Sequence, residues 1–141
     1  MNPAEQVMEL SVFLAVESVE HSSADLGALI GLAPDEKWDR GSSYKMGEKE
    51  KTNKFSRWAI AEHAADGEFH DVVVERLVGR ARPFEQQFRQ LPKGVRLLFS
   101  IYRTGADTVF GFGLAVPQLQ FLANIGAEVN LSFVVCVGKG S

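Results

Sequence analysis

The chain contains 141 residues, which fits a single domain of residues 1–141 with a core of its own. Hydrophobic residues make up 45% of the sequence and charged residues 23%, values that argue against a largely disordered chain. The formal net charge of -3 argues against a general binder of nucleic acid or of membrane surfaces. No apolar run is long enough to cross a bilayer and the N-terminal residues show no secretory signal, so we expect a cytoplasmic protein.

The first predicted elements are a strand and a helix. Every second residue of 10–16 is apolar, which predicts a strand with one buried face. Ser22 or Ser23 is expected to cap the helix that follows, and Gly31 to end it. The helix is expected to turn three apolar side chains toward the core: Leu26, Leu29 and Ile30.

The middle of the chain is predicted to contain a long surface loop. Residues 35–54 are charged and contain glycines, with little apolar periodicity, and we expect residues 42–53 to be their most flexible part. A second strand is predicted over residues 55–62. The apolar spacing of residues 71–91 predicts an amphipathic helix, which Pro83 should kink or divide.

The C-terminal third predicts two more strands, a helix and a final strand. The two strands are expected over residues 95–102 and 108–114. Pro117 suits the start of a helix, which Gly126 ends. The final strand, residues 129–137, shows the clearest alternation in the chain. Its expected core-facing side chains include Val129, Leu131 and Phe133.

The predicted order is therefore strand, helix, strand, long helix, two strands, helix and strand. This order predicts an α+β fold, in which helices pack on one face of a mainly antiparallel sheet of about five strands. Both a ferredoxin-like arrangement and an internally duplicated one fit the order. The segment SADLGALIGL weakly resembles VPQLQFLANIGA, but an alignment of the two needs an insertion.

The glycines of FGFG, residues 110–113, do not form a phosphate-binding loop. A dinucleotide-binding motif needs a third glycine where Val116 stands, and a P-loop needs Gly-Lys where Pro117 begins the helix. We therefore expect Gly113 to serve close packing within a strand, and we predict no nucleotide cofactor.

The densest group of potential metal ligands lies in EHAADGEFHD, residues 62–71. The group consists of Glu62, His63, Asp66, Glu68, His70 and Asp71. The two histidines are seven residues apart across a glycine turn, which does not match the spacing of a helical zinc motif. Acidic residues near a helix N-terminus explain the same pattern, so we predict no metal site.

No nucleophile with a matching base is apparent in the sequence. Cys136 is the only cysteine, so the chain can form no internal disulfide. His21 stands beside Ser22 and Ser23, where helix capping accounts for the serines better than catalysis does. We therefore assign no catalytic residue.

Four residues form the candidate partner-binding surface: Trp38, Arg40, Arg57 and Trp58. Aromatic and arginine side chains are the usual anchors of protein interfaces, which favours this interpretation. The alternative is that both tryptophans pack onto the sheet, because tryptophan is buried in most proteins.

Several segments together resemble a known bacterial family. These are LIGLAP at the end of the first helix, KWDRG, SRWAI and the closing segment GFGLAVPQLQFLANIGAEVNLSFVV. Over residues 9–137 the chain resembles the domain-of-unknown-function family DUF4279. The family has no assigned activity, so the resemblance transfers no site residue. Some small domains of this kind are associated with immunity to bacterial toxins.

Two functional hypotheses follow. The first is a non-catalytic module that binds a protein partner, such as a cognate toxin, and it agrees with the acidic net charge and the resemblance. The second is a small-molecule-binding protein or an enzyme, with a pocket between sheet and helices lined by Phe110, Phe112 and Trp58. The sequence leaves the oligomeric state open.

Because no credible ligand set is present, we predict that a chelator leaves the melting temperature of the protein unchanged. Thermal melts with and without EDTA test this. A fall of several degrees that a divalent ion restores would favour a metal site at His63 and His70.

Overall fold

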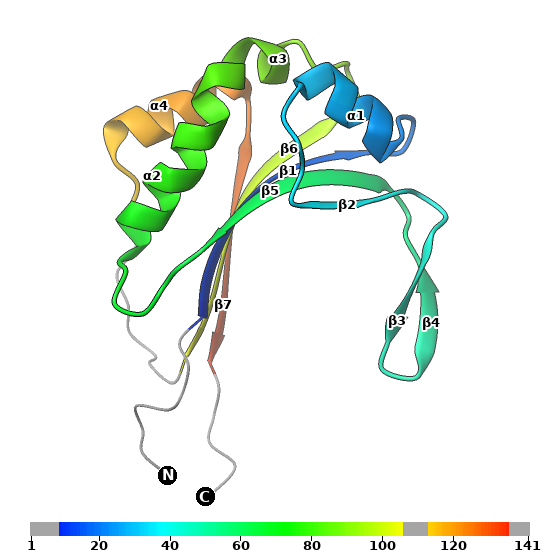
Figure 1. The fold of residues 1–141 in the computed structure, drawn as a ribbon, viewed down its shortest axis with the longest axis horizontal. Coiled ribbons are helices and arrows are strands. Elements are labelled where there is room, and N and C mark those ends of the chain that lie inside the picture. The colour runs from blue at the N-terminus through cyan, green and yellow to red at the C-terminus, as the bar shows by residue number, and fades with distance from the viewer. Residues whose placement is uncertain (1–8, 106–112, 136–141) are drawn as a thin grey trace, which may run out of the picture.

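In the computed structural model, residues 9–105 and 113–135 are described, and they form a five-stranded sheet, a separate hairpin and helices against one sheet face (Figure 1). The strands are β1 (Glu9–Ser18), β2 (Glu36–Trp38), β3 (Ser43–Met46), β4 (Lys49–Thr52), β5 (Ser56–His63), β6 (Arg96–Gly105) and β7 (Glu128–Val135). The helices are α1 (Ser23–Ile30), α2 (His70–Ala81), the 3-10 turn η2 (Arg82–Phe84), α3 (Glu85–Arg89) and α4 (Val116–Ile125).

The main sheet has the order β2-β5-β1-β6-β7. β1 lies at its centre and pairs antiparallel with both β5 and β6. Only β7 runs parallel to its neighbour, because α4 carries the chain back across the sheet between β6 and β7. The predicted α+β fold with a mainly antiparallel sheet is confirmed. The strands of the N-terminal half pair antiparallel with each other, whereas the two strands of the C-terminal half, β6 and β7, pair parallel.

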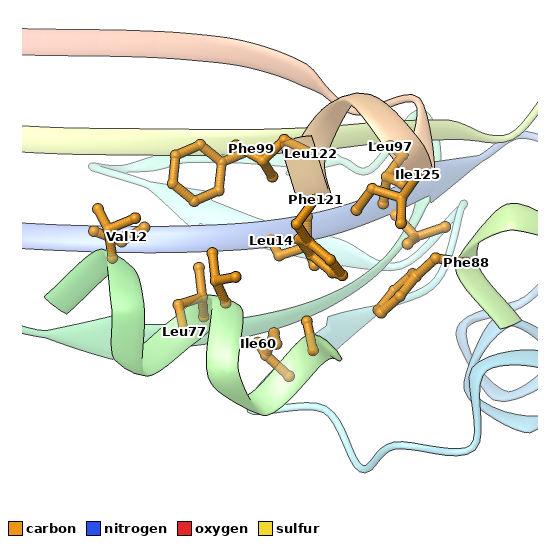
Figure 2. Close-up of a cluster of buried hydrophobic side chains, with 14 of the residues drawn as sticks. Val12, Leu14, Ile60, Leu77, Phe88, Leu97, Phe99, Phe121, Leu122 and Ile125 are labelled. Atoms are coloured by element: carbon orange, nitrogen blue, oxygen red, sulfur yellow. The ribbon is translucent and has the colours of Figure 1, made fainter. Parts of the chain in front are cut away.

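The core lies between the sheet and the helices, as Figure 2 shows. Each central strand contributes alternate side chains to it, because successive residues of a strand point to opposite faces. From the strands come Val12, Leu14, Val16, Trp58, Ile60, Leu97, Phe99 and Ile101, and from the helices mainly Leu26, Ile30, Val73, Val74, Leu77, Val78, Phe88, Phe121, Leu122 and Ile125.

The predicted helix boundaries are confirmed by their local geometry. Ser22 caps α1, because its hydroxyl accepts a hydrogen bond from the Asp25 amide at 3.1 Å. Gly31 ends α1 with a backbone φ of 81°, a value that L side chains disfavour. Pro83 divides the long amphipathic segment, so that the chain passes from α2 through η2 into α3.

The surface position predicted for residues 35–54 is confirmed for β3 and β4, but the prediction that the segment is a loop is wrong. Residues 36–38 form the edge strand β2, and β3 and β4 form a hairpin that projects away from the main sheet (Figure 1). Gly47 and Glu48 make a two-residue turn, and the φ of 67° at Gly47 suits a glycine in the first turn position. Every residue of β3 and β4 is exposed, which explains why apolar periodicity did not reveal the hairpin.

The prediction that β7 contributes a buried apolar row is also wrong. Val129, Leu131 and Phe133 are 45%, 50% and 40% exposed. They lie on the helix side of the sheet, because Val129 and Leu131 pair with the buried residues Phe99 and Ile101 of β6. The buried residues of α4 pack toward Phe99 and Leu97 of β6 (Figure 2), and the outer row on β7 remains partly in solvent.

The predicted strand over residues 108–114 lies mostly outside the described residues, as do Gly111 and Cys136. Its described end, Gly113 and Leu114, is not in a strand. A Cβ atom added to Gly113 would meet no described atom within 4 Å, so the close packing expected at this glycine is wrong. Leu29 was also expected to face the core, but its side chain is 44% exposed.

Ile101 and Leu131 are directly paired on the same sheet face but differ in burial, 0% against 50% exposed. We predict that Ile101→Ala lowers the free energy of unfolding by about 2–5 kcal/mol. Leu131→Ala should lower it by less than about 1 kcal/mol, because half of the side chain is already in water. Denaturant titrations of the two variants, at protein concentrations low enough for the chain to be monomeric, provide the measurement, and equal losses would contradict the exposed placement of β7.

Candidate functional site

A charged and aromatic row crosses the sheet face that the helices leave open. Arg57 of β5 is flanked by Glu17 of β1 and by Trp38 of β2 in the strand register. Its guanidinium lies 3.1 Å from a Glu17 carboxylate oxygen and 3.0 Å from one of Glu36, and 5.2 Å from the centre of the Trp38 rings. The side chain of Arg57 is only 16% exposed, and two carboxylates balance its charge. Arg57 thereby links β5 to both β1 and β2.

Trp38 forms the aromatic end of this row. Its rings contact the Arg57 guanidinium and also the ring of Phe55, whose centre is 6.4 Å away. The indole Nε1 of Trp38 is buried, and it has no hydrogen-bond acceptor among the described residues. A buried donor without an acceptor costs about 1–3 kcal/mol, a cost that an ordered water next to the indole would remove.

A groove of about 1120 Å³ opens beside Trp38, between the end of the sheet and the hairpin. Its walls combine three aromatic side chains with lysines. The lining residues are Trp38, Ser42, Ser43, Tyr44, Lys49, Glu50, Lys51, Thr52, Asn53, Lys54 and Phe55. Residues 42–54 contain four lysines and two glutamates, so the groove is locally basic in a chain whose net charge is -3.

Arg40 lies near this cluster, but its hydrogen bonds hold the segment after β2 in place. Its backbone amide donates to the Ser56 hydroxyl at 3.0 Å, and its guanidinium donates to the Val19 carbonyl at 3.1 Å. The neighbouring Asp39 accepts a hydrogen bond from the Ser23 amide at 2.7 Å. This bond is the main reason why the pKa of Asp39 is lowered. The segment after β2 is thus tied to both β5 and α1.

Trp58 is not part of the surface cluster. It lies on the opposite face of β5 from Arg57, is 0% exposed, and packs edge-on against Phe88. Its indole N–H donates to the Leu32 carbonyl at 3.1 Å, which satisfies the only polar atom of the side chain. The structure therefore brings together Trp38 and Arg57, places Arg40 beside them, and puts Trp58 in the core.

Two of the acidic residues predicted as potential metal ligands, Glu62 and Glu68, form ion pairs with arginines of α2, as does Asp35 from outside that group. Arg80 lies 2.9 Å from carboxylate oxygens of both Asp35 and Glu62, and Arg76 lies 2.5 Å from Glu68 and 3.4 Å from Glu62. These ion pairs fasten α2 to β5 and to the segment before β2. The arginines supply the positive charge that these partly buried carboxylates need. The carboxylates are therefore already used within the fold.

The pKa values of two of these acids follow from the pairing. Burial alone would raise the pKa of Asp35, but hydrogen bonds from Arg80 and from the Ala61 amide outweigh it and lower the pKa. The pKa of Glu68 is lowered chiefly by the Ala65 amide and then by Arg76. Both carboxylates are therefore held in the charged form at neutral pH.

The two histidines of the same stretch point to different neighbours. His63 Nδ1 lies 2.7 Å from the Ser11 hydroxyl on the adjacent strand and packs edge-on against Phe13. His70 Nε2 accepts a hydrogen bond from the Gly113 amide at 3.3 Å. Within the described residues, no group of three or more His, Cys, Asp or Glu side chains is placed to hold a metal ion.

The hairpin side chains that line the groove are candidate functional residues that sequence reasoning missed. Tyr44 and Lys51 face each other across β3 and β4, and both line the groove. Gly47-Glu48 between two short segments of alternating residues is a turn signal that could have revealed the hairpin. Nothing in the local sequence indicates that the hairpin lies beside Trp38.

Comparison with known proteins places this fold in a family. The family model described as domain of unknown function (DUF4279) matches residues 8–135, so the chain belongs to that family. No curated protein and no solved structure matches the chain at a significant level. No helix within the described part of the chain is both long and apolar enough to cross a membrane.

We predict that Arg80→Met lowers the free energy of unfolding by about 1–2 kcal/mol at pH 7, because Asp35 and Glu62 lose a shared, partly solvent-screened partner. A lowered carboxyl pKa contributes stability above the unfolded pKa of about 4, and that contribution is lost as pH falls through the folded value. The difference between wild type and variant should therefore shrink below about pH 4.

The control is Arg89→Met, which changes an exposed arginine of α3 for which no ion pair is present among the described residues. It should change stability by less than about 0.5 kcal/mol. Urea titrations between pH 3 and pH 7 give both comparisons. An Arg80→Met effect that grows toward low pH would contradict the role of Asp35.

Proposed function

We propose that this protein is a non-catalytic, cytoplasmic protein-binding module of the immunity type, whose groove beside Trp38 receives a segment of a partner such as a cognate toxin. The observation that carries the proposal is the groove itself, a hollow of about 1120 Å³ with aromatic walls and a lysine-rich hairpin. Tryptophan, tyrosine and arginine are the side chains on which protein interfaces most often depend.

The chemistry of the groove supports a partner segment that is acidic and partly aromatic or apolar. Tyr44 is 42% exposed and offers a flat apolar surface with a polar tip. Lys49, Lys51 and Lys54 would attract carboxylates of the partner as it approaches. The Trp38 rings add an aromatic wall against which apolar side chains of the segment can pack.

The position of the hairpin also supports binding of a protein. β3 and β4 project from the sheet, so their exposed side chains can reach a second molecule without rearranging the core (Figure 1). The alternative pocket between sheet and helices has less support. Trp58 is buried against Phe88 there, and Phe110 and Phe112 lie outside the described residues.

The test begins with affinity capture from the source cells, in which genes next to this one supply the first candidate partners. The purified partner is then titrated calorimetrically against wild type and two truncations on β3. Tyr44→Ala, which removes a groove wall, should weaken binding at least about tenfold. Met46→Ala, on the same strand but outside the groove lining, should leave the affinity unchanged.

Both side chains are exposed, so neither truncation should disturb folding, and thermal melts verify this. A partner that binds Tyr44→Ala as tightly as wild type would place its binding site elsewhere on the protein. A small molecule that copurifies with the protein, and whose loss lowers the melting temperature, would instead support a ligand-binding function.

A further inference from the structure

The outer edge of β7 is a surface that the proposed function does not use. β7 is eight residues long and pairs with β6 on one side, while no described strand pairs with its other side. An edge strand presents a row of backbone N–H and C=O groups that can pair with another strand. The edge lies at the opposite end of the sheet from Trp38 and the groove.

The two edges of the sheet differ in how well they resist such pairing. β2 is three residues long and carries Glu36 and Lys37, and short or charged edges discourage strand addition. β7 is longer and less charged, because it spans eight residues, contains no lysine or proline, and carries Glu128 as its one charged residue. Glu128 already forms an ion pair with Arg96 at 2.8 Å.

The side chains along this edge are apolar on one face. Val129 and Leu131 are 45% and 50% exposed, and they lie on the same sheet face as the core residues Phe99 and Ile101. A strand added at this edge would continue that face and remove the two side chains from water, which is favourable by roughly 25 cal/mol per Å².

We propose that two copies of this protein associate through β7, whose edges pair antiparallel around a two-fold axis at Leu131. The pairing extends the five-stranded sheet into one continuous sheet of both copies. A two-fold contact closes on itself, so it produces a dimer and not a filament.

The sequence of β7 is self-complementary in this register. Leu131 faces the partner's Leu131, and Val129 faces the partner's Phe133, so apolar side chains meet on the helix face. On the other face Asn130 meets the partner's Ser132, and these two polar side chains can hydrogen-bond. Cross-strand pairs of like polarity are the arrangement that stabilises antiparallel strands.

The charges of the strand also fit a second copy. Glu128 lies three residues from the axis, so the two copies of Glu128 are six residues apart along the paired strands. At 3.3 Å per residue this separation is about 20 Å, beyond the range at which exposed charges repel strongly. A shift of the register toward Glu128 would bring the two carboxylates together, which disfavours registers shifted in that direction.

The proposal is tested by light scattering coupled to gel filtration. Wild type at about 100 μM should have the mass of two chains. Leu131→Lys and Leu131→Glu should each have the mass of one chain, because like charges then meet at the axis, and an equimolar mixture of the two variants should regain the dimer. Val72→Lys, on α2 at a residue 48% exposed, should remain dimeric.

A cross-linking measurement covers the case in which the charged variants fold poorly. In a Cys136→Ser background, Leu131→Cys should form a disulfide-linked dimer on mild oxidation, since directly opposed Cα atoms lie about 4.5–5.5 Å apart. Asn130→Cys should not, because Asn130 faces the partner's Ser132. A monomeric wild type, a mixture of charge variants that stays monomeric, or efficient cross-linking through residue 130 would each overturn the proposal.

Discussion

The burial of one face of the central strand is the constraint on which the rest of the structure depends. β1 is hydrogen-bonded on both sides, and Val12 and Val16 on its helix face are fully buried. Exposure of such a face would lose the largest favourable contribution to folding, so helices have to cover it. All the described helices accordingly lie on this side, and no described helix covers the other side of the sheet (Figure 1).

The open face meets water and combines small and charged side chains with a few larger apolar ones, among them Phe13 and Leu98. Ala15 and Ala59 face each other near its centre and are fully buried, although no helix lies above them. Arg57, two residues before Ala59 on β5, forms ion pairs with a carboxylate from each neighbouring strand. On α2, Arg76 and Arg80 play a similar part at the sheet margin. These arginines tie elements together, and their charges are therefore largely used within the fold.

The surfaces left for other molecules lie at the two ends of the sheet. At the β2 end the chain continues into a projecting hairpin, and a basic aromatic groove opens beside Trp38. At the β7 end the strand edge is apolar and carries no protecting charge besides Glu128. The two ends differ in polarity, in shape and in the backbone groups they expose, so the two proposed contacts do not compete for the same surface.

The sequence by itself determined the features that local physics controls. Ser22 caps a helix and Pro83 interrupts one through contacts with neighbouring residues in the sequence. The alternation of β1 likewise indicates a strand with one buried face. Only the tertiary structure decided that Trp58 is buried while Trp38 lines a groove on the other face, and that Leu131 is half exposed. The reason is that burial depends on which strands neighbour one another and on where each helix lies. Those contacts join residues far apart in the sequence, and a local pattern cannot distinguish a central strand from an edge strand.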